Sequence, residues 1–247
     1  MFVVRPKIGW ETPRALAKML GCETRYYPNK ENPRRFDWKT DFLMTPVHPD
    51  LLDNAPPEYV YTHHFGTRNK YGQRKILEEF VPIPSAANSK EGAQSLLGER
   101  FVVRPLRHAR GADFRITSNR LDFIPGTEYI QELYPKRREY RVIFVFGKQL
   151  IVLRKKPNEG VSFDEPWGLN ATYQTVYDIP ACYLSGTDCF SRLPTVPAIK
   201  GSHILAADIM YNPDAEKKWV VLELNFCPAL EWAPHREKVV EAIRART

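Results

Sequence analysis

Residues 203–231 (HILAADIMYNPDAEKKWVVLELNFCPALE) are the stretch around which the rest of the chain is expected to be organised. Two apolar segments, ILAADIM and WVVLELNF, are joined by the polar turn NPDAEKK, a pattern typical of a β-hairpin with a longer connection. Asp208 lies in the first segment, and Glu223 and Asn225 lie in the second. Because residues two apart in a strand share a face, Glu223 and Asn225 are expected to point the same way.

A carboxylate inside an apolar strand is costly to bury unless a cation or hydrogen bonds compensate it. Oxygen atoms of Asp208, Glu223 and Asn225 would suit a hard divalent cation, above all Mg²⁺ held together with a phosphate group. The alternative is that Asp208 and Glu223 pair with arginine or lysine in a structural network. The hairpin alone leaves both interpretations open, so the rest of the chain has to decide between them.

The composition narrows the class of protein. The 247 residues suffice for one large or two to three small compact units. Lys and Arg exceed Asp and Glu by 36 − 29 = 7, which favours anionic partners without separating nucleotides, nucleic acid and acidic substrates. The four cysteines lack zinc-site spacing, no run approaches the roughly 20 apolar residues of a membrane span, and Arg5 and Lys7 interrupt any signal-peptide core. We therefore expect a cytoplasmic protein.

The chain before residue 63 indicates a small α/β unit. An opening strand, MFVV, is followed by a helix that begins near Pro13 and stops at Gly21, and two further strands are expected in DFLMTPV and in EYVYTHHF (58–65). Adjacent residues of a strand point to opposite faces, so His63 and His64 are not expected to ligate one metal together. Whether one of them faces a substrate stays open.

Two stretches after residue 100 carry clustered arginines. The segment FVVRPLRHARGADFRI predicts a strand, a basic turn and a return strand, and arginine forks with free N–H groups at such a turn suit a polyphosphate, although a solvated basic loop would look the same. The segment REYRVIFVFGKQLIVLRKKP predicts a hairpin that turns at Gly147-Lys148. Arg141 and Arg154 can then lie near one another across it. Residues 157–200 read as irregular, and such long stretches often cover a site or bind a partner.

These signals, in this order, resemble the ATP-grasp superfamily over roughly residues 70–232, in the style of ribosomal-protein glutamate ligases and glutathione synthetases. The resemblance implies an α+β class and an ATP-grasp fold, in which two α+β subdomains clasp ATP, with a small N-terminal α/β unit. It implies three domains: the N-terminal unit (1–62), a central subdomain with the phosphate loop (63–128) and a C-terminal subdomain with the hinge and the metal site (129–247).

The resemblance also assigns roles to particular residues. It implies phosphate binding by Arg104 and Arg110, and adenine and ribose binding by the four hinge residues Gln131, Glu132, Leu133 and Tyr134. It implies nucleotide binding by Glu139, the acid of an acid-x-Arg pair that opens the hairpin, and charge neutralisation at the transferring group by Arg141 and Arg154. It implies metal binding by Asp208, Glu223 and Asn225. Three positions depart from the family pattern. Arg104 stands where a lysine is usual, Glu139 replaces a common aspartate, and Gly111 is the only glycine of the phosphate turn.

The function that the resemblance implies is ATP-dependent ligation of a carboxylate to an amine or thiol. ATP would phosphorylate a small-molecule or peptide carboxylate, and an amine would displace the phosphate to leave an amide and ADP. ATP and Mg²⁺ are the expected cofactors, with Mn²⁺ as the alternative ion. Phosphoryl transfer needs positioning and charge neutralisation more than a protein nucleophile, and no Ser-His-Asp or Cys-His arrangement is recognisable.

Two other functions remain from the sequence. The first is a non-catalytic protein of the same fold that binds a nucleotide or nucleic acid on its basic face. The second is a ligase that attaches an amino acid to a modified nucleic acid base, against which the lack of an interleaved aromatic and basic motif argues. Neither the acid, the amine nor the oligomeric state follows from the sequence.

Overall fold

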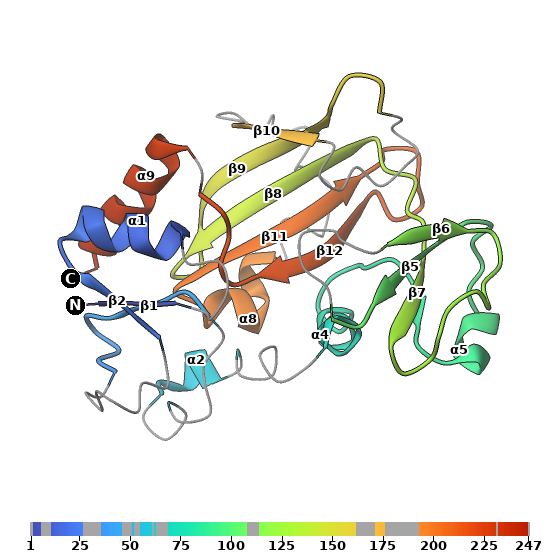
Figure 1. Ribbon diagram of the computed structural model, residues 1–247, viewed down its shortest axis with the longest axis horizontal. Coiled ribbons are helices and arrows are strands. Elements are labelled where there is room, and N and C mark those ends of the chain that lie inside the picture. The colour runs from blue at the N-terminus through green and yellow to red at the C-terminus, as the bar shows by residue number, and fades with distance from the viewer. Residues whose placement is uncertain are drawn as a thin grey trace.

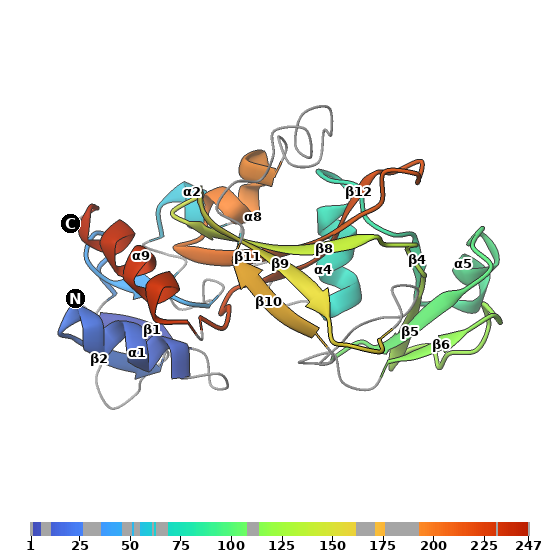
Figure 2. The same cartoon turned by 90° about the horizontal axis from the view of Figure 1, so that it is seen from above.

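The computed structural model describes residues 2–5, 11–26, 36–45, 51, 55–60, 62, 69–107, 114–161, 171–175, 193–230 and 232–246. The strands of these residues form three sheets of three, five and four strands. The sheets follow one another along the longest axis of the molecule, with the small sheet at the end that holds both termini and the five-stranded sheet in the middle (Figure 1; Figure 2 from above).

The N-terminal sheet is parallel, as expected for an α/β unit. Its elements are β1 (Phe2–Arg5), α1 (Glu11–Leu20), β2 (Glu23–Tyr26) and β3 (Phe42–Leu43), and the strand order is β2-β1-β3. Helix α9 (Ala233–Arg244) packs against α1 and brings the end of the chain back to its beginning (Figure 1). Leu16 and Val239 are fully buried in this region.

The four-stranded sheet lies at the far end of the molecule. Its strands are antiparallel in the order β4-β7-β5-β6, namely β4 (Ala86–Ala87), β5 (Phe101–Pro105), β6 (Arg115–Thr117) and β7 (Glu128–Glu132). Ser89 caps the short helix α5 (Lys90–Gln94) by accepting a hydrogen bond from the N–H of Gly92.

The five-stranded sheet contains both predicted hairpins. Its antiparallel strands are β8 (Arg138–Val145), β9 (Lys148–Pro157), β10 (Ala171–Thr175), β11 (Ile204–Tyr211) and β12 (Trp219–Asn225), in the order β10-β9-β8-β11-β12. Gly147 forms the tight β8–β9 turn with φ = 73°, a conformation that favours glycine. Two antiparallel sheets and the flanking helices confirm the α+β class.

The two faces of the five-stranded sheet have different neighbours. Val142 lies in a core with α4 (Lys70–Leu77), the turn η2 (Leu193–Thr195) and α8 (Pro197–Lys200), whereas Ile143 lies in a core with α1, α9 and β1. The alternation of side chains along β8 therefore separates two layers. We call the side that Ile143 faces the N-terminal face, and the side that Val142 faces the α4 face.

The sequence prediction was wrong in two segments. Residues 57–60 form helix α2 and not a strand, because Pro57 suits a first helical turn and Tyr59 packs on Trp38 in a buried aromatic cluster. Within the stretch expected to be irregular, β10 pairs with β9, and its threonines and tyrosine suit an extended strand. The strand β7, which the sequence assigned to the C-terminal subdomain, pairs with β4 and β5 of the four-stranded sheet, whereas the division into three domains stays a prediction. Across the described ranges, no helix is long and apolar enough to cross a membrane.

Candidate nucleotide and metal site

The residues expected to bind a metal lie together on the N-terminal face of the five-stranded sheet. Asp208 of β11 is directly opposite Glu223 of β12, and Asn225 is opposite Ala206. The pairing of β11 with β12 shifts by one residue between Asp208 and Ile209, which leaves Leu222 as an extra residue in β12. Because of this shift, Glu223 and Asn225 lie on the same face of the sheet as Asp208. Asp208 is almost fully buried, with 5% of its surface exposed.

Short contacts join these side chains. The amide nitrogen Nδ2 of Asn225 donates to Oδ2 of Asp208 and to Oε1 of Glu223, both at 3.1 Å. Burial raises the pKa of Asp208, and the guanidinium of Arg141 opposes this while Glu223 adds to it. No group of three or more Asp, Glu, His or Cys side chains that could hold a metal occurs in the described ranges. Two carboxylates and an amide would therefore hold a cation only if another ligand, such as a phosphate, completed its shell.

We call Asp208, Glu223 and Asn225 the acid cluster, and basic side chains contact its two carboxylates. Arg141 of β8 is opposite Asp208 and donates to both of its carboxylate oxygens, from Nε at 2.6 Å and Nη2 at 2.8 Å. Lys70, the first residue of α4, lies 3.4 Å from Oε2 of Glu223. The structural pairing that the sequence left open is thus present in this structure, and the metal role stays a prediction.

Arg104 lies on β5, opposite Tyr129 of β7, and Tyr129 is hydrogen-bonded to it. The buried Nε atom of Arg104 has no hydrogen-bond partner within the described part of the chain. Arg74 of α4 is buried near it and donates to the main-chain oxygens of Leu222 and Pro84, at 3.1 Å and 2.6 Å. Arginines from two elements therefore converge beside the acid cluster. Arg110, the second predicted phosphate ligand, lies outside the described residues, as do His63 and His64.

Three of the four hinge residues make hydrogen bonds to segments outside the strand pairs of their sheet. Oε1 of Glu132 accepts from the N–H groups of Leu97 (2.7 Å) and Gly98 (3.2 Å). The N–H of Leu133 donates to the carbonyl of Arg100, at 2.9 Å. These contacts tie the hinge to the loop that follows α5.

The hydroxyl of Tyr134 donates to the carbonyls of Lys217 and Lys218, at 2.6 Å and 2.9 Å, in the turn between β11 and β12. Gln131 differs from these residues. Its side chain is 2% exposed, and its Oε1 has no partner within the described ranges. Gln131 is thus the hinge side chain whose polar group remains available to a ligand.

Glu139 lies between two ammonium groups. Lys136 contacts its Oε2 at 2.7 Å and Lys155 contacts its Oε1 at 3.0 Å, and all three side chains are largely buried. Burial by itself raises the pKa of Glu139, but the two lysines outweigh it and hold the pKa below its ordinary value. Lys70, Lys136 and Lys155 were not predicted. For Lys136 the spacing of three residues from Glu139 was the available signal.

The expectation that Arg154 would lie beside Arg141 was wrong. Arg154 is opposite Tyr140, and Leu153 is opposite Arg141, so Arg154 points to the α4 face. The cause is a register shift between Ile143 and Phe144, because an unbroken hairpin from the Val145–Lys148 pair would place Arg154 opposite Glu139. Lys155 takes that place instead.

Comparisons with known proteins establish the fold. No protein-family model matches the chain, and no curated protein sequence matches it. Solved structures do match it along nearly its whole length. The ATP-grasp ligase PsnB, complexed with minimal precursor, Mg and ADP, is 15% identical with a TM-score of 0.59, over 99% of this chain and 96% of that one.

Two further solved structures show the same likeness. The D-alanine–D-alanine ligase from Bacillus anthracis complexed with ATP is 14% identical (TM-score 0.57; 99% and 96% of the two chains). The macrocyclase MdnC from Microcystis aeruginosa MRC, bound to the precursor peptide MdnA, is also 14% identical (TM-score 0.56; 99% and 100%). At these identities the comparisons speak for the fold alone.

Proposed function

We propose that this chain, which has the ATP-grasp fold, is an ATP-dependent ligase that joins a carboxylate to an amine. One observation carries the proposal. Asp208, Glu223 and Asn225, predicted as metal ligands from the sequence, meet on one face of the sheet, and Arg141 and Lys70 contact their carboxylates. Acidic and basic side chains in contact with one another suit the binding of ATP phosphates together with a metal ion, because phosphoryl transfer depends on positioning and charge neutralisation.

The cluster fits Mg²⁺ bound together with ATP phosphates, and Mn²⁺ has the same ligand requirements here. Without nucleotide, Arg141 neutralises Asp208 and Lys70 neutralises Glu223. With nucleotide, we expect an exchange of partners, in which Arg141 and Lys70 turn to the phosphates and the freed carboxylates take the cation. The cation, when bound, supplies charge neutralisation at the transferring phosphate. Such an exchange keeps every buried charge paired.

Orphaned atoms point to the remaining contacts of the nucleotide. Nε of Arg104 and Oε1 of Gln131 are buried without partners among the described residues. An unsatisfied buried polar group costs about 1–3 kcal/mol, which a bound ligand would relieve. Arg104 would contact the phosphates and Gln131 the base, while Glu132, Leu133 and Tyr134 shape the hinge through their protein contacts.

The proposed reaction has two steps. The γ-phosphoryl group of ATP is transferred to the substrate carboxylate, and an amine then displaces phosphate from the acyl phosphate to form an amide. Arg141 is placed to neutralise the charge of the transferring group, because its guanidinium already lies on the face that carries the acid cluster. Lys155, on the same face, takes the second cationic position that the sequence assigned to Arg154.

A second function has an observation of its own in its favour. The Arg141–Asp208 and Lys70–Glu223 pairs neutralise the carboxylates without any metal, as in a non-catalytic nucleotide-binding protein of the same fold. Such a protein would bind ATP and fail to turn it over. The two functions therefore differ in one measurable property, the metal-dependent release of ADP.

ADP release should be measured with pooled carboxylic acids and amines, with and without Mg²⁺. The matched pair of variants is Asn225→Ala in the cluster and Glu216→Gln, an exposed residue of the adjoining turn. We expect Mg²⁺-dependent release for the wild type and for Glu216→Gln, and about a 100-fold loss in Asn225→Ala, the effect of removing one group worth about 2.7 kcal/mol at the transition state. Equally slow hydrolysis by the wild type and Asn225→Ala under every condition would refute the ligase function.

A further inference from the structure

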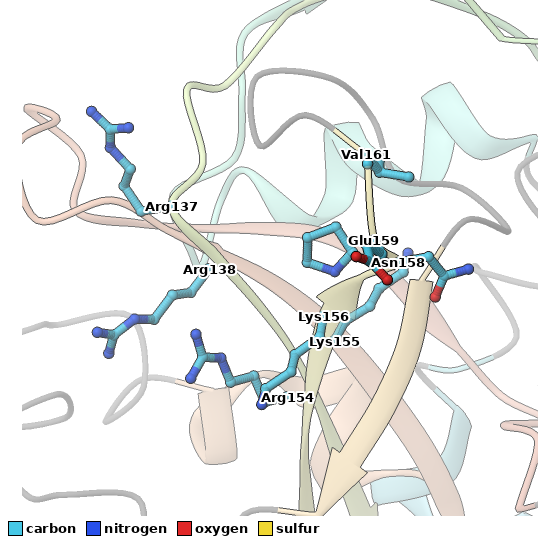
Figure 3. Close-up of a pocket in the computed structure, with 10 residues that line it drawn as sticks. Arg137, Arg138, Arg154, Lys155, Lys156, Asn158, Glu159 and Val161 are labelled. Atoms are coloured by element: carbon cyan, nitrogen blue, oxygen red, sulfur yellow. The ribbon is translucent and has the colours of Figure 1, made fainter.

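A second concentration of positive charge lies away from the acid cluster. A pocket of about 410 Å³ opens where β8 begins and β9 ends. Five of its ten lining residues are basic (Arg137, Arg138, Arg154, Lys155 and Lys156), and Glu159 is the one acidic residue among them. Figure 3 shows Arg138 and Arg154 extending to the same side of the two strands.

Three of the pocket's cations lie on the face of the sheet opposite the candidate nucleotide site, and Lys155, which contacts Glu139, is the lining residue that the pocket and the site share. Arg154 is opposite Tyr140, and Tyr140 packs in the core on the α4 face of the sheet. Arg138 and Lys156 lie two residues from Tyr140 and Arg154 along their strands, so they share that face. Asp208 and its partners lie on the N-terminal face, and a ligand in the pocket would not occupy their site.

Three of these cations lack a partner. In the described part of the chain, the side chains of Arg137, Arg154 and Lys156 make no hydrogen bond or ion pair. Lys155 also lines the pocket, but its ammonium group contacts Glu139. Like charges held close together repel one another, and an anion bound between them removes that repulsion.

The lining indicates which anion would bind. Small-molecule pockets are lined mostly by apolar residues and bury about 70–90% of the ligand, whereas six of the ten residues that line this pocket are charged, and Arg137, Lys156 and Glu159 are exposed. None of the ten lining residues is aromatic, so the stacking platforms that bind single-stranded nucleic acids are absent from this pocket. The guanidinium forks suit carboxylates. These features favour an acidic peptide.

We propose that this pocket is a docking site for an acidic segment of a peptide substrate. That the peptide is a substrate rests on the proposed ligase function, whereas its binding in the pocket does not. Carboxylate side chains of the segment pair with Arg137, Arg154 and Lys156, and the reacting carboxylate of the same peptide is free to enter the site on the opposite face.

Binding of a fluorescein-labelled hexaglutamate peptide, measured by fluorescence anisotropy without nucleotide, tests the proposal. The test variant is Arg137→Gln with Lys156→Gln. The matched control, Lys18→Gln with Lys200→Gln, removes the same total charge from exposed lysines elsewhere. An exposed ion pair is worth up to about fivefold in affinity, so the test variant should bind more weakly by up to about 25-fold and the control should bind like the wild type. Both doubles should keep the wild-type rate of ADP release.

Competition and turnover separate the alternatives. Hexaglutamate should displace the labelled peptide, whereas hexalysine, inorganic phosphate and oligothymidylate at equal charge should not. Stronger displacement by phosphate or by the oligonucleotide would overturn the peptide assignment. Equal weakening in the test and control variants would reduce the effect to net charge and also overturn it. Binding that follows these expectations, without ADP release under any condition, would refute the ligase function and leave the docking site intact.

Discussion

Stability should depend on pH through His203, a buried residue outside the proposed chemistry. His203 is 1% exposed, and its Nδ1 accepts the N–H of Leu43 at 3.0 Å, so its proton resides on Nε2, which has no partner within the described ranges. Aromatic rings enclose it, among them Tyr59 at a ring-centroid distance of 4.9 Å, and Arg246 is the nearby charged group. Burial and then the positive charge of Arg246 lower the pKa of His203 to about 3.

The size of the effect follows from the difference between the folded and unfolded pKa values. The unfolded histidine takes up a proton below about pH 6.5, whereas the folded one stays neutral down to about pH 3. The contribution of His203 to stability is therefore complete above pH 6.5 and falls by about 1.4 kcal/mol for each pH unit below it. At pH 5 the loss amounts to 1.5 pH units, or about 2 kcal/mol.

Urea unfolding at pH 7, 6 and 5 measures this loss, with His203→Asn as the control. The amide oxygen of asparagine can still accept the N–H of Leu43, but asparagine does not titrate. The variant is expected to be less stable at pH 7, because it loses packing with the surrounding rings, and to lose about 2 kcal/mol less than the wild type between pH 7 and 5. Parallel pH profiles for the two proteins would show that His203 is protonated in the folded state and would refute the reasoning.

Three further changes can be tested by urea unfolding. Glu139→Gln leaves two largely buried ammonium groups without their carboxylate and should lower the free energy of unfolding by about 3–5 kcal/mol. Glu78→Gln breaks an exposed ion pair and should lower it by less than about 1 kcal/mol. Similar losses in the two variants would contradict the buried network. Gly201→Ala should cost about 1–3 kcal/mol or more, because a Cβ there would clash with the main-chain oxygen of Glu58, and an unchanged midpoint of unfolding would exclude that close packing. Tyr134→Phe removes the hydroxyl that joins the hinge to the β11–β12 turn and should cost about 1 kcal/mol; no loss would show that the bond adds nothing to stability.

The comparison of sequence and structure separates local from non-local information. Both hairpins of the five-stranded sheet were predictable, because the apolar pattern of each strand and the turn-forming residues between the strands lie within a short stretch of sequence. The same local rule placed Glu223 and Asn225 on one face, and the observed register adds Asp208 to it. The ATP-grasp likeness, predicted from the order of these motifs, was confirmed at the level of the fold.

Contacts between distant segments were beyond such rules. The helix at Tyr59 depends on Trp38, and the partners of Glu132 lie 34 and 35 residues away, so no window of sequence contains either. The four hinge residues were assigned together from a motif, yet only the tertiary structure shows that Gln131 retains an unsatisfied oxygen.

The positions of Arg154 and Lys155 show most clearly what could not be predicted from the sequence. Residue types and spacing placed a cation near Arg141, and that part of the prediction needs only the chain sequence. Which of the two neighbours provides it depends on one extra residue in β9, because a single-residue shift exchanges the faces of every side chain beyond it. The sequence by itself determined the strands and the chemistry that they carry, whereas the packing of the whole sheet decided the register, and with it that Lys155 lies on the face of the acid cluster and Arg154 on the α4 face.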